Sequence, residues 1–145
     1  MTATIRPYQD ADLQAVIHAW ESASRVAHSF VTEQFLDEER HNIPTLYLPN
    51  ADTYVAEVGS NVVGFIALIG EEVGAIFLDP AYHGQGIGRA MMDKAASLNE
   101  IIKLRVFADN TVGRAFYASY GFTEEGAFID ERTGLNMLWL HYTRP

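Results

Sequence analysis

Apolar residues between positions 13 and 20 recur at intervals of three and four, which is the spacing of one face of an amphipathic helix. Asp10 precedes this stretch and can cap the helix. Thr32, followed by Glu and Gln, predicts the start of a second helix, which we expect to run to about Ile43. Pro44 and Pro49 are expected to close this helical region, because a proline cannot donate the backbone hydrogen bond of a continuing helix.

Strands are expected in the middle of the chain, where β-branched and aromatic residues gather. Residues 53–58 and 62–69 flank the polar turn at Gly59-Ser60-Asn61 and are predicted to form a hairpin. Residues 73–78 predict a further strand, and a proline at position 80 ends it because it cannot pair in a ladder. A short strand is also expected at residues 4–6.

The remainder of the chain predicts two more helices, at residues 86–98 and 110–120, with a buried strand at 101–108 between them. The Asn110 side chain is expected to cap the start of the second helix, and Gly121 to cap its end in a left-handed conformation. Two closing strands are expected at about 122–129 and 135–142. The order β-α-α-β-β-β-α-β-α-β-β predicts an α/β (α+β) fold, with a central mixed sheet and helices on its faces.

Composition limits what this fold can do. The chain has 145 residues, with neither an internal repeat nor a linker, and we expect a single domain over residues 1–145. It contains no cysteine, which excludes disulfides, zinc–thiolate sites and cysteine nucleophiles. The N-terminus shows no apolar leader and no run approaches membrane-spanning length, so we expect a cytoplasmic protein without a membrane partner.

The charge balance indicates the kind of partner. The formal net charge is −9, from 19 acidic and 10 basic residues. Such a surface repels phosphate backbones, so nucleic acid is not expected as a partner, whereas a cationic amine is favoured.

Three alternating glycines, Gly84, Gly86 and Gly88, lie between the end of a predicted buried strand and the start of a predicted helix. This arrangement points free backbone N–H groups at one place, where the positive end of the helix dipole adds to them. Glycine also lets a phosphate approach the backbone without meeting a Cβ atom. The loop therefore predicts a ligand that carries a phosphate or pyrophosphate.

Other phosphate loops fit less well. A Walker loop requires Gly-x-x-x-x-Gly-Lys-Ser/Thr, which the chain lacks. The dinucleotide fingerprint Gly-x-Gly-x-x-Gly fails because no glycine stands at its third place, which argues against a nucleotide-dependent oxidoreductase. The remaining alternative is a turn that only connects strand and helix.

The loop resembles the coenzyme A signature of the GNAT family of N-acetyltransferases, Arg/Gln-x-x-Gly-x-Gly/Ala, which appears here as residues 83–88 with histidine at the first place. A second family signature, Asn-x-x-Ala/Gly-x-x-Phe-Tyr-x-x-x-Gly-Phe, is matched by residues 110–122. Two separate motifs in the right order make the resemblance specific. The stretch Trp20–Val31 is also similar to the YjaB-type bacterial branch of the family.

The resemblance implies the GNAT fold, in which a mostly antiparallel twisted sheet of about seven strands carries about four helices. It implies acetyl-coenzyme A as cosubstrate, with the pantetheine arm in a cleft beside the strand that ends at Leu78 and a backbone N–H of that strand polarising the thioester carbonyl. The cofactor-binding residues implied in this way are Phe77, Leu78, Asp79, His83, Gly84, Gln85, Gly86, Ile87, Gly88, Arg89, Asn110, Gly113 and Phe116.

The resemblance also implies catalytic roles. Tyr117 matches the general acid that donates a proton to the coenzyme sulfur, although an aromatic on an amphipathic helix also serves packing. Glu72 matches a catalytic base of some members, with Glu57 and a water chain as alternatives. Direct attack of the amine in a ternary complex is favoured over a covalent enzyme intermediate, because neither a cysteine nor a serine nucleophile elbow is present.

Several residues have simpler interpretations beside functional ones. His28 and Phe30 lie in the connection between the first two helices, which lines the acceptor pocket in this family, although a lone histidine more often has a structural hydrogen bond. The histidines show no metal-ligand spacing, and we expect no metal. The charged residues Asp130, Glu131 and Arg132 are interpreted as a solvated tip of the last turn.

The leading hypothesis is an acetyl-coenzyme A-dependent N-acetyltransferase acting on a primary amine of a small molecule or peptide, as a monomer or homodimer. The alternative is a non-catalytic module that senses acyl-coenzyme A and regulates a partner, which would keep the glycine loop without turnover. A toxin that acetylates charged tRNA would need a basic face, which the net charge of −9 opposes.

Overall fold

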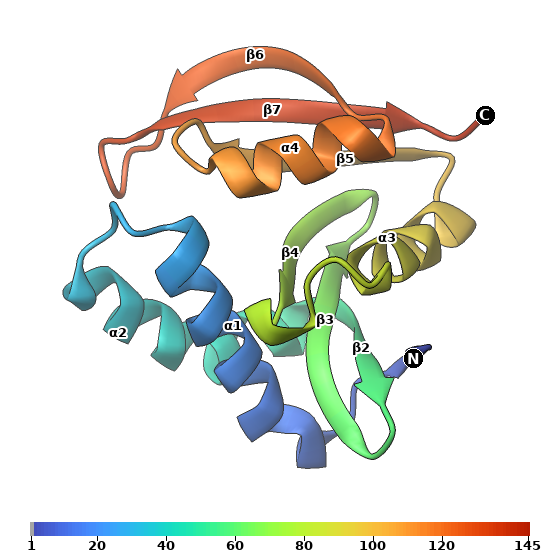
Figure 1. The fold of residues 1–145 in the computed structure, drawn as a ribbon. Coiled ribbons are helices and arrows are strands. Elements are labelled where there is room, and N and C mark those ends of the chain that lie inside the picture. Colours follow the sequence, from blue (N-terminus) through green and yellow to red (C-terminus); the bar gives the residue numbers. More distant parts are fainter. Residues whose placement is uncertain (1) are drawn as a thin grey trace.

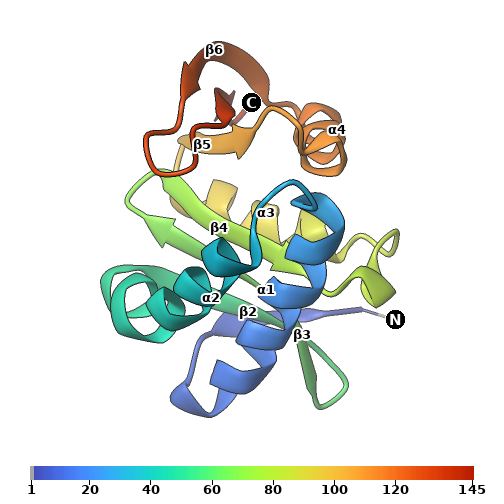
Figure 2. The same cartoon turned by 90° about the vertical axis from the view of Figure 1, so that its left-hand side faces the viewer.

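The structure is a computed structural model that describes residues 2–145. It consists of one twisted sheet with helices on both faces, as Figures 1 and 2 show from two sides. The elements follow the predicted order: β1 (Thr4–Pro7), α1 (Leu13–Ala27), α2 (Glu33–Asn42), β2 (Asp52–Val58), β3 (Asn61–Ile69), β4 (Glu72–Leu78), α3 (Ile87–Leu98), β5 (Ile101–Phe107), α4 (Thr111–Tyr120), β6 (Thr123–Ile129) and β7 (Asn136–Thr143).

The sheet confirms the predicted mixed topology. Its seven strands lie in the order β1-β2-β3-β4-β5-β7-β6. Neighbouring strands are antiparallel except β4 and β5, which are parallel and are joined through α3. Strands β5, β7 and β6 with α4 form the upper part of Figure 1, and β1–β4 with α1 and α2 form the lower part.

Local sequence signals set several helix ends as predicted. The Thr32 hydroxyl accepts a hydrogen bond from the Phe35 N–H at 3.1 Å and caps α2. The Asn110 side chain caps α4 in the same way, accepting from the Gly113 N–H at 2.8 Å. Gly121 ends α4 with a φ of +123°, a backbone angle that residues with a Cβ atom rarely adopt.

The prolines after α2 do not close the helical region where they were expected to. The chain continues past α2 as a wide helical turn at Ile43–Tyr47 and a tight turn at Leu48–Asn50, each containing a proline near its start. A proline at the start of a helical turn is tolerated, because its missing N–H has no partner there in any case. Pro44 and Pro49 therefore redirect the helix rather than end it.

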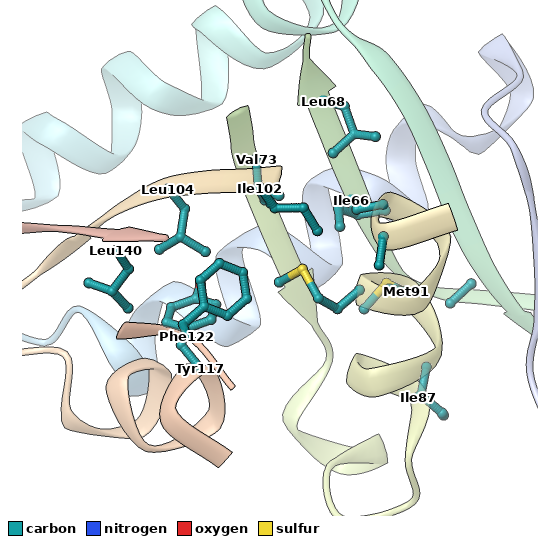
Figure 3. Close-up of a cluster of buried hydrophobic side chains, with 14 of the residues drawn as sticks. Ile66, Leu68, Val73, Ile87, Met91, Ile102, Leu104, Tyr117, Phe122 and Leu140 are labelled. Carbon is teal, nitrogen blue, oxygen red and sulfur yellow. The ribbon is translucent and has the colours of Figure 1, made fainter. Parts of the chain in front are cut away.

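Two apolar cores lie on opposite faces of the sheet. On the first face, α1 and α2 pack on the sheet through Val16, Trp20, Leu36, Ile43, Val55 and Phe65. The larger core, drawn in Figure 3, joins α3 and α4 to the other face, with Met91, Tyr117 and Phe122 facing Ile66, Leu104 and Leu140. Phe77 packs against the first core and its neighbours Ile76 and Leu78 against the second, as the alternation of a strand requires.

Gly64 on β3 lets the backbones of β3 and β4 approach closely near the end of β4. An added Cβ atom at Gly64 would lie 2.8 Å from the Phe77 carbonyl oxygen and 3.3 Å from the Leu78 Cα atom. Both neighbours are backbone atoms, so neither can move without shifting β4.

Substituting Gly64 tests this close approach. We expect Gly64→Ala to lower the free energy of unfolding by about 1–3 kcal/mol, since overpacking forces a backbone shift. Gly126→Ala in β6 is the matched control, because an added Cβ atom there meets nothing within 4 Å. Urea unfolding of both variants measures the difference in the free energy of unfolding. Equal midpoints would show that the β4 backbone shifts to accept the added methyl group without loss of stability.

Candidate active site between β4 and β5

An extra residue in β4 opens the sheet. The register of β3 and β4 shifts from the pair Ala67↔Ala75 to the pair Leu68↔Val73, which leaves Gly74 as the unpaired residue of a β-bulge. A bulge bends its strand and increases the local twist. Within residues 2–145, β4 pairs with β5 only at Glu72↔Lys103 and Val73↔Leu104, directly before this bulge. Beyond it the two strands run apart.

The separation leaves one edge of β4 open. The Asp79 N–H donates to the Val63 carbonyl on β3 at 2.8 Å, so by alternation along the strand the N–H and C=O of Ile76 and Leu78 face away from β3. The Leu78 carbonyl accepts a hydrogen bond from His83 Nε2 at 3.1 Å, as a group on the open edge can. The other polar groups at this edge are placed to pair with an extended ligand.

The glycine loop that follows β4 provides a concave set of backbone amides. Gly84 and Gly86 adopt φ values of +78° and +81°, and an added Cβ atom at either would point into open space. Glycine is therefore required here by the left-handed backbone rather than by crowding. Gly86 precedes the first residue of α3, so the unpaired N–H groups of the first helical turn face the same space.

A cavity of about 400 Å³, here called the glycine-loop cavity, extends from this loop along β4 to α4. Of the predicted cofactor-binding residues, those that line it are Phe77, Leu78, His83, Gly84, Gly86, Ile87, Gly88, Arg89, Asn110, Gly113 and Phe116. Gln85 and Asp79 do not line it, and Asp79 instead caps the next turn by accepting from the Ala81 N–H at 3.0 Å. The open loop, the helix N-terminus and the free strand edge together fit the pyrophosphate and the amide-bearing arm of coenzyme A.

A second cavity of about 210 Å³, the inner cavity, lies on the other side of Tyr117. It is lined by α1, the turns after α2, the middle of β4 and the end of β5. It shares four residues with the glycine-loop cavity: Ile76, Phe77, Asn110 and Tyr117. Two groups that enter the glycine-loop cavity and the inner cavity would therefore meet at this junction.

Tyr117 is buried at the junction, between the rings of Phe116 and Phe122. Burial raises the pKa of its phenol above the ordinary value, because the charged phenolate would lose its solvation. The hydroxyl therefore keeps its proton at neutral pH. The packing interpretation of this residue is confirmed, since its ring belongs to the core, and the same ring lines both cavities. Its role as general acid stays a prediction.

His28 lines the inner cavity and has the structural hydrogen bond that the simpler interpretation expected. Its role in binding the acceptor stays a prediction. Its ring packs against Phe77 and Phe107, and its Nε2 atom lies 3.2 Å from Asn110 Nδ2. Burial lowers the pKa of its imidazole to about 4. Phe30 does not line this cavity, but its ring packs against those of His28 and Phe107.

The candidate bases occupy different places. Glu72 forms an ion pair with Arg105 at 3.1 Å and lines a hollow of about 230 Å³ outside the inner cavity, here called the outer hollow. Glu57 pairs with Arg6 at 3.2 Å and lines neither of the two cavities nor the outer hollow. The positions of the two residues favour Glu72 over Glu57.

The tip around Arg132 is exposed, as expected, but Arg132 also makes contacts that the sequence did not predict. The Arg132 guanidinium pairs with Glu39 and, at 3.0 Å, with Glu38, and it lies 4.6 Å from the centre of the Phe35 ring. The tip of the β6–β7 hairpin is thereby fixed to α2 across the outer hollow. The pairing of Arg132 with α2 joins residues more than ninety positions apart, so no local sequence pattern predicts it.

Two further residues of the inner cavity escaped sequence reasoning. Glu39 lines the cavity and accepts a hydrogen bond from the Tyr47 hydroxyl at 2.8 Å. Ser24 is buried in the lining four positions before His28 and four after Trp20. That spacing places all three on one side of α1, which is a signal that could have identified Ser24.

The described residues contain neither a metal-binding cluster nor a membrane-spanning helix. Among residues 2–145, no three histidine, aspartate or glutamate side chains are grouped so that they could hold a metal ion. No helix in the same range is long and apolar enough to span a bilayer.

Comparison with known proteins places the chain in a family. Residues 49–124 match the family described as acetyltransferase (GNAT) domain. The chain is 30% identical over 127 residues to the peptidyl-lysine N-acetyltransferase YjaB of Salmonella typhimurium, covering 87% of each protein. It is 27% identical over 119 residues to the peptidyl-lysine N-acetyltransferase YiaC of Escherichia coli, covering 81% of this chain and 82% of the relative.

Solved structures agree with this placement. The solution structure of apo-form YjaB from Escherichia coli superposes with a TM-score of 0.89 at 26% identity, over the full length of both chains. The PaiA N-acetyltransferase of Thermoplasma acidophilum, solved in complex with coenzyme A, matches the fold with a TM-score of 0.76 at 21% identity, over 99% of each chain. The chain therefore belongs to the GNAT family and is an acetyltransferase that uses acetyl-coenzyme A.

Proposed function

We propose that this acetyltransferase modifies the side-chain amine of lysine in peptides or proteins, by direct attack in a ternary complex. The observation that carries the proposal is the mainly apolar inner cavity that reaches Tyr117. Its apolar lining includes Trp20, Ile43, Leu48, Phe65, Val106 and Met137. The names of the relatives YjaB and YiaC, both peptidyl-lysine N-acetyltransferases, support the same acceptor.

The lining distinguishes two kinds of peptide amine. A lysine side chain presents an unbranched hydrocarbon stem, which an apolar cavity can bury while the peptide backbone stays outside. A peptide N-terminus would bring its first amide groups into the same cavity. Burying such groups without hydrogen-bond partners costs about 1–3 kcal/mol each, so the lysine side chain is favoured.

Two peptides of matched sequence test this choice. One carries a single lysine and a blocked N-terminus, and the other a free N-terminus with arginine in place of lysine. We expect acetylation of the first only, measured by thiol release and by the mass of the peptide. The enzyme's own lysines, Lys94 and Lys103, are readily followed in the same spectra as an internal background.

The outcomes of this experiment separate the alternatives. Acetylation of the free N-terminus alone would replace lysine by an α-amine as the acceptor. Absence of turnover on both peptides would contradict the proposed acceptor class.

The glycine-loop cavity would hold the cosubstrate. The amides of Gly84, Gln85, Gly86, Ile87, Gly88 and Arg89 would bind its pyrophosphate, and the open edge of β4 at Ile76 and Leu78 would pair with its pantetheine amides. Acetyl-coenzyme A supplies the acetyl group as a thioester. A free N–H on that edge can donate to the thioester carbonyl oxygen and stabilise the charge that develops there.

Tyr117 completes the proton balance. The reaction forms the amide N–C bond and breaks the C–S bond, so one proton must leave the nitrogen and one must reach the sulfur. Tyr117, whose raised pKa keeps its hydroxyl protonated, donates its proton to the sulfur. It takes a proton back from water before the next turnover.

Tyr117→Phe removes this proton while keeping the ring. We expect kcat to fall by about 100-fold or more, since general acid catalysis contributes on that order, with little change in acetyl-coenzyme A binding. Tyr120→Phe on the same helix is the control, because the Tyr120 hydroxyl bonds Asp93 at 2.7 Å on the α3 side. Steady-state rates and calorimetric affinities would be compared, and an unchanged kcat in Tyr117→Phe would reject the assigned acid.

Glu72 is our proposal for the proton acceptor. An alkylamine has a pKa near ~10, so most acceptor molecules must lose a proton before attack. The outer hollow that Glu72 lines shares Glu39, Gly74 and Arg105 with the inner cavity, so water in it could carry the proton outward. The pairing with Arg105 keeps the carboxylate in place at the start of β4.

Glu72→Gln isolates the carboxylate. We expect kcat/KM for the lysine peptide to fall by about 10-fold or more near pH 7 and to recover as the pH approaches the pKa of the amine, where free amine is abundant. Glu71→Gln is the control, since this neighbouring glutamate pairs with Lys103 at 3.4 Å and lies outside the outer hollow. Matching pH–rate profiles for both variants would leave the water chain as the route.

The remaining expectations concern binding partners, cellular location and oligomeric state. The net charge of −9 favours basic, lysine-bearing acceptors over nucleic acid. A cytoplasmic location, the lack of a membrane partner and a monomeric or homodimeric state stay predictions from the sequence.

A further inference from the structure

The Ser24 hydroxyl, in the lining of the inner cavity, is a buried polar group without a hydrogen-bond partner among residues 2–145. Helix α1 presents Trp20, Ser24 and His28 to this cavity at four-residue intervals. Ser24 is only 1% exposed, and its hydroxyl forms no hydrogen bond within residues 2–145. A buried hydroxyl without a partner costs free energy, so its position in the lining calls for a ligand that satisfies it.

His28 cannot play this part with its acceptor nitrogen. The Asn110 Oδ1 atom accepts from the Gly113 N–H at the start of α4, which turns Nδ2 of the same amide toward His28. An amide nitrogen only donates, so His28 Nε2 must accept and the ring proton must be on Nδ1. The acceptor nitrogen of His28 is therefore already used, and the low pKa of the buried ring keeps it neutral.

The charged groups of the lining are also occupied. Glu39 is held by Arg132 and by the Tyr47 hydroxyl, and Arg105 is held by Glu72. Tyr117 is assigned to the sulfur on the opposite side of the junction. Ser24 therefore offers a buried, uncharged hydrogen-bond acceptor to whatever enters along α1.

We propose that the Ser24 hydroxyl accepts a hydrogen bond from the acceptor amine and so orients its lone pair toward the thioester. The inference rests on the proposed function, because it presumes that an alkyl amine enters the inner cavity. A primary amine has N–H bonds to spare, so one can be given to Ser24 Oγ while the lone pair stays free for attack. An uncharged acceptor in an apolar lining also suits the neutral amine, the form that reacts.

The main test compares Ser24→Ala with the unmodified enzyme on a lysine peptide and on n-butylamine. We expect kcat/KM for both amines to fall by about threefold to tenfold, the size of one net hydrogen bond, with the KM for acetyl-coenzyme A unchanged. Ser24→Cys should lose a similar factor, because sulfur keeps the bulk of the side chain but accepts weakly. The melting temperature of Ser24→Ala should not fall, since the substitution removes a buried group that has no partner in the free enzyme.

Thr53→Val is the matched control. The Thr53 hydroxyl on β2 is also buried without a partner, but Thr53 lines neither the inner cavity nor the glycine-loop cavity. Removing it should leave kcat/KM for both amines unchanged. A similar loss in Thr53→Val would show that the Ser24 effect is general to buried hydroxyls and would overturn the proposal.

The outcomes distinguish this inference from the proposed function. The role of Ser24 would be overturned, while lysine acetylation stands, by any of three results for Ser24→Ala. These are an unchanged kcat/KM for the amines, a rise in the KM for acetyl-coenzyme A as large as the loss in kcat/KM for the amines, and a fall in melting temperature. Turnover of n-butylamine but not of the lysine peptide would overturn the peptide acceptor, and the Ser24 comparison would then be decided on n-butylamine. Turnover of neither amine would overturn both.

Discussion

The active site depends on the bulge at Gly74, where β4 stops pairing with β5 after only two register positions. On one side of β4 the antiparallel ladder with β3 continues to Leu78, and β5 is held by a seven-residue ladder with β7, so both strands stay rigid as they separate. The separation leaves the outward-facing backbone groups of Ile76 and Leu78 without a partner on β5, a state that sheet strands normally avoid, and His83 satisfies only the Leu78 carbonyl. A ligand that pairs with this edge completes the sheet.

The space between β4 and β5 is mainly apolar, and this determines the protonation states of the titratable side chains that line it. The same loss of solvation raises the pKa of the Tyr117 phenol and lowers that of the His28 imidazole, so both groups are uncharged at neutral pH. A protonated phenol is ready to donate, and a neutral imidazole can accept from Asn110. Charged side chains lie further out, where Glu72, Glu39 and their arginine partners border the outer hollow. Under the proposed function, an amine would pass these charged groups before it meets the neutral ones.

Sequence reasoning succeeded for several interactions that span only a few residues, although α1 is preceded by Asp12 rather than capped by Asp10 as expected. The caps of Thr32 and Asn110 and the left-handed glycine at Gly121 depend on neighbours three or four positions away, and all were predicted. It did not predict the pairing of Arg132 with α2, and it overlooked Ser24, whose importance comes from a cavity that several other elements enclose. At Pro44 a local rule was applied too strictly, because proline is tolerated at the start of a helical turn.

The sequence by itself determined the order of elements, the family and the position of the glycine loop, because periodicity, caps and glycine spacing act through the nearby backbone. Only the tertiary structure decided which side chains meet at Tyr117. His28 and Asn110 are 82 positions apart in the chain yet in hydrogen-bond contact, and the bulge at Gly74 is visible only in the register against β3. Such contacts arise from packing helices onto a twisted sheet, and the alternation of residues along one strand cannot specify them.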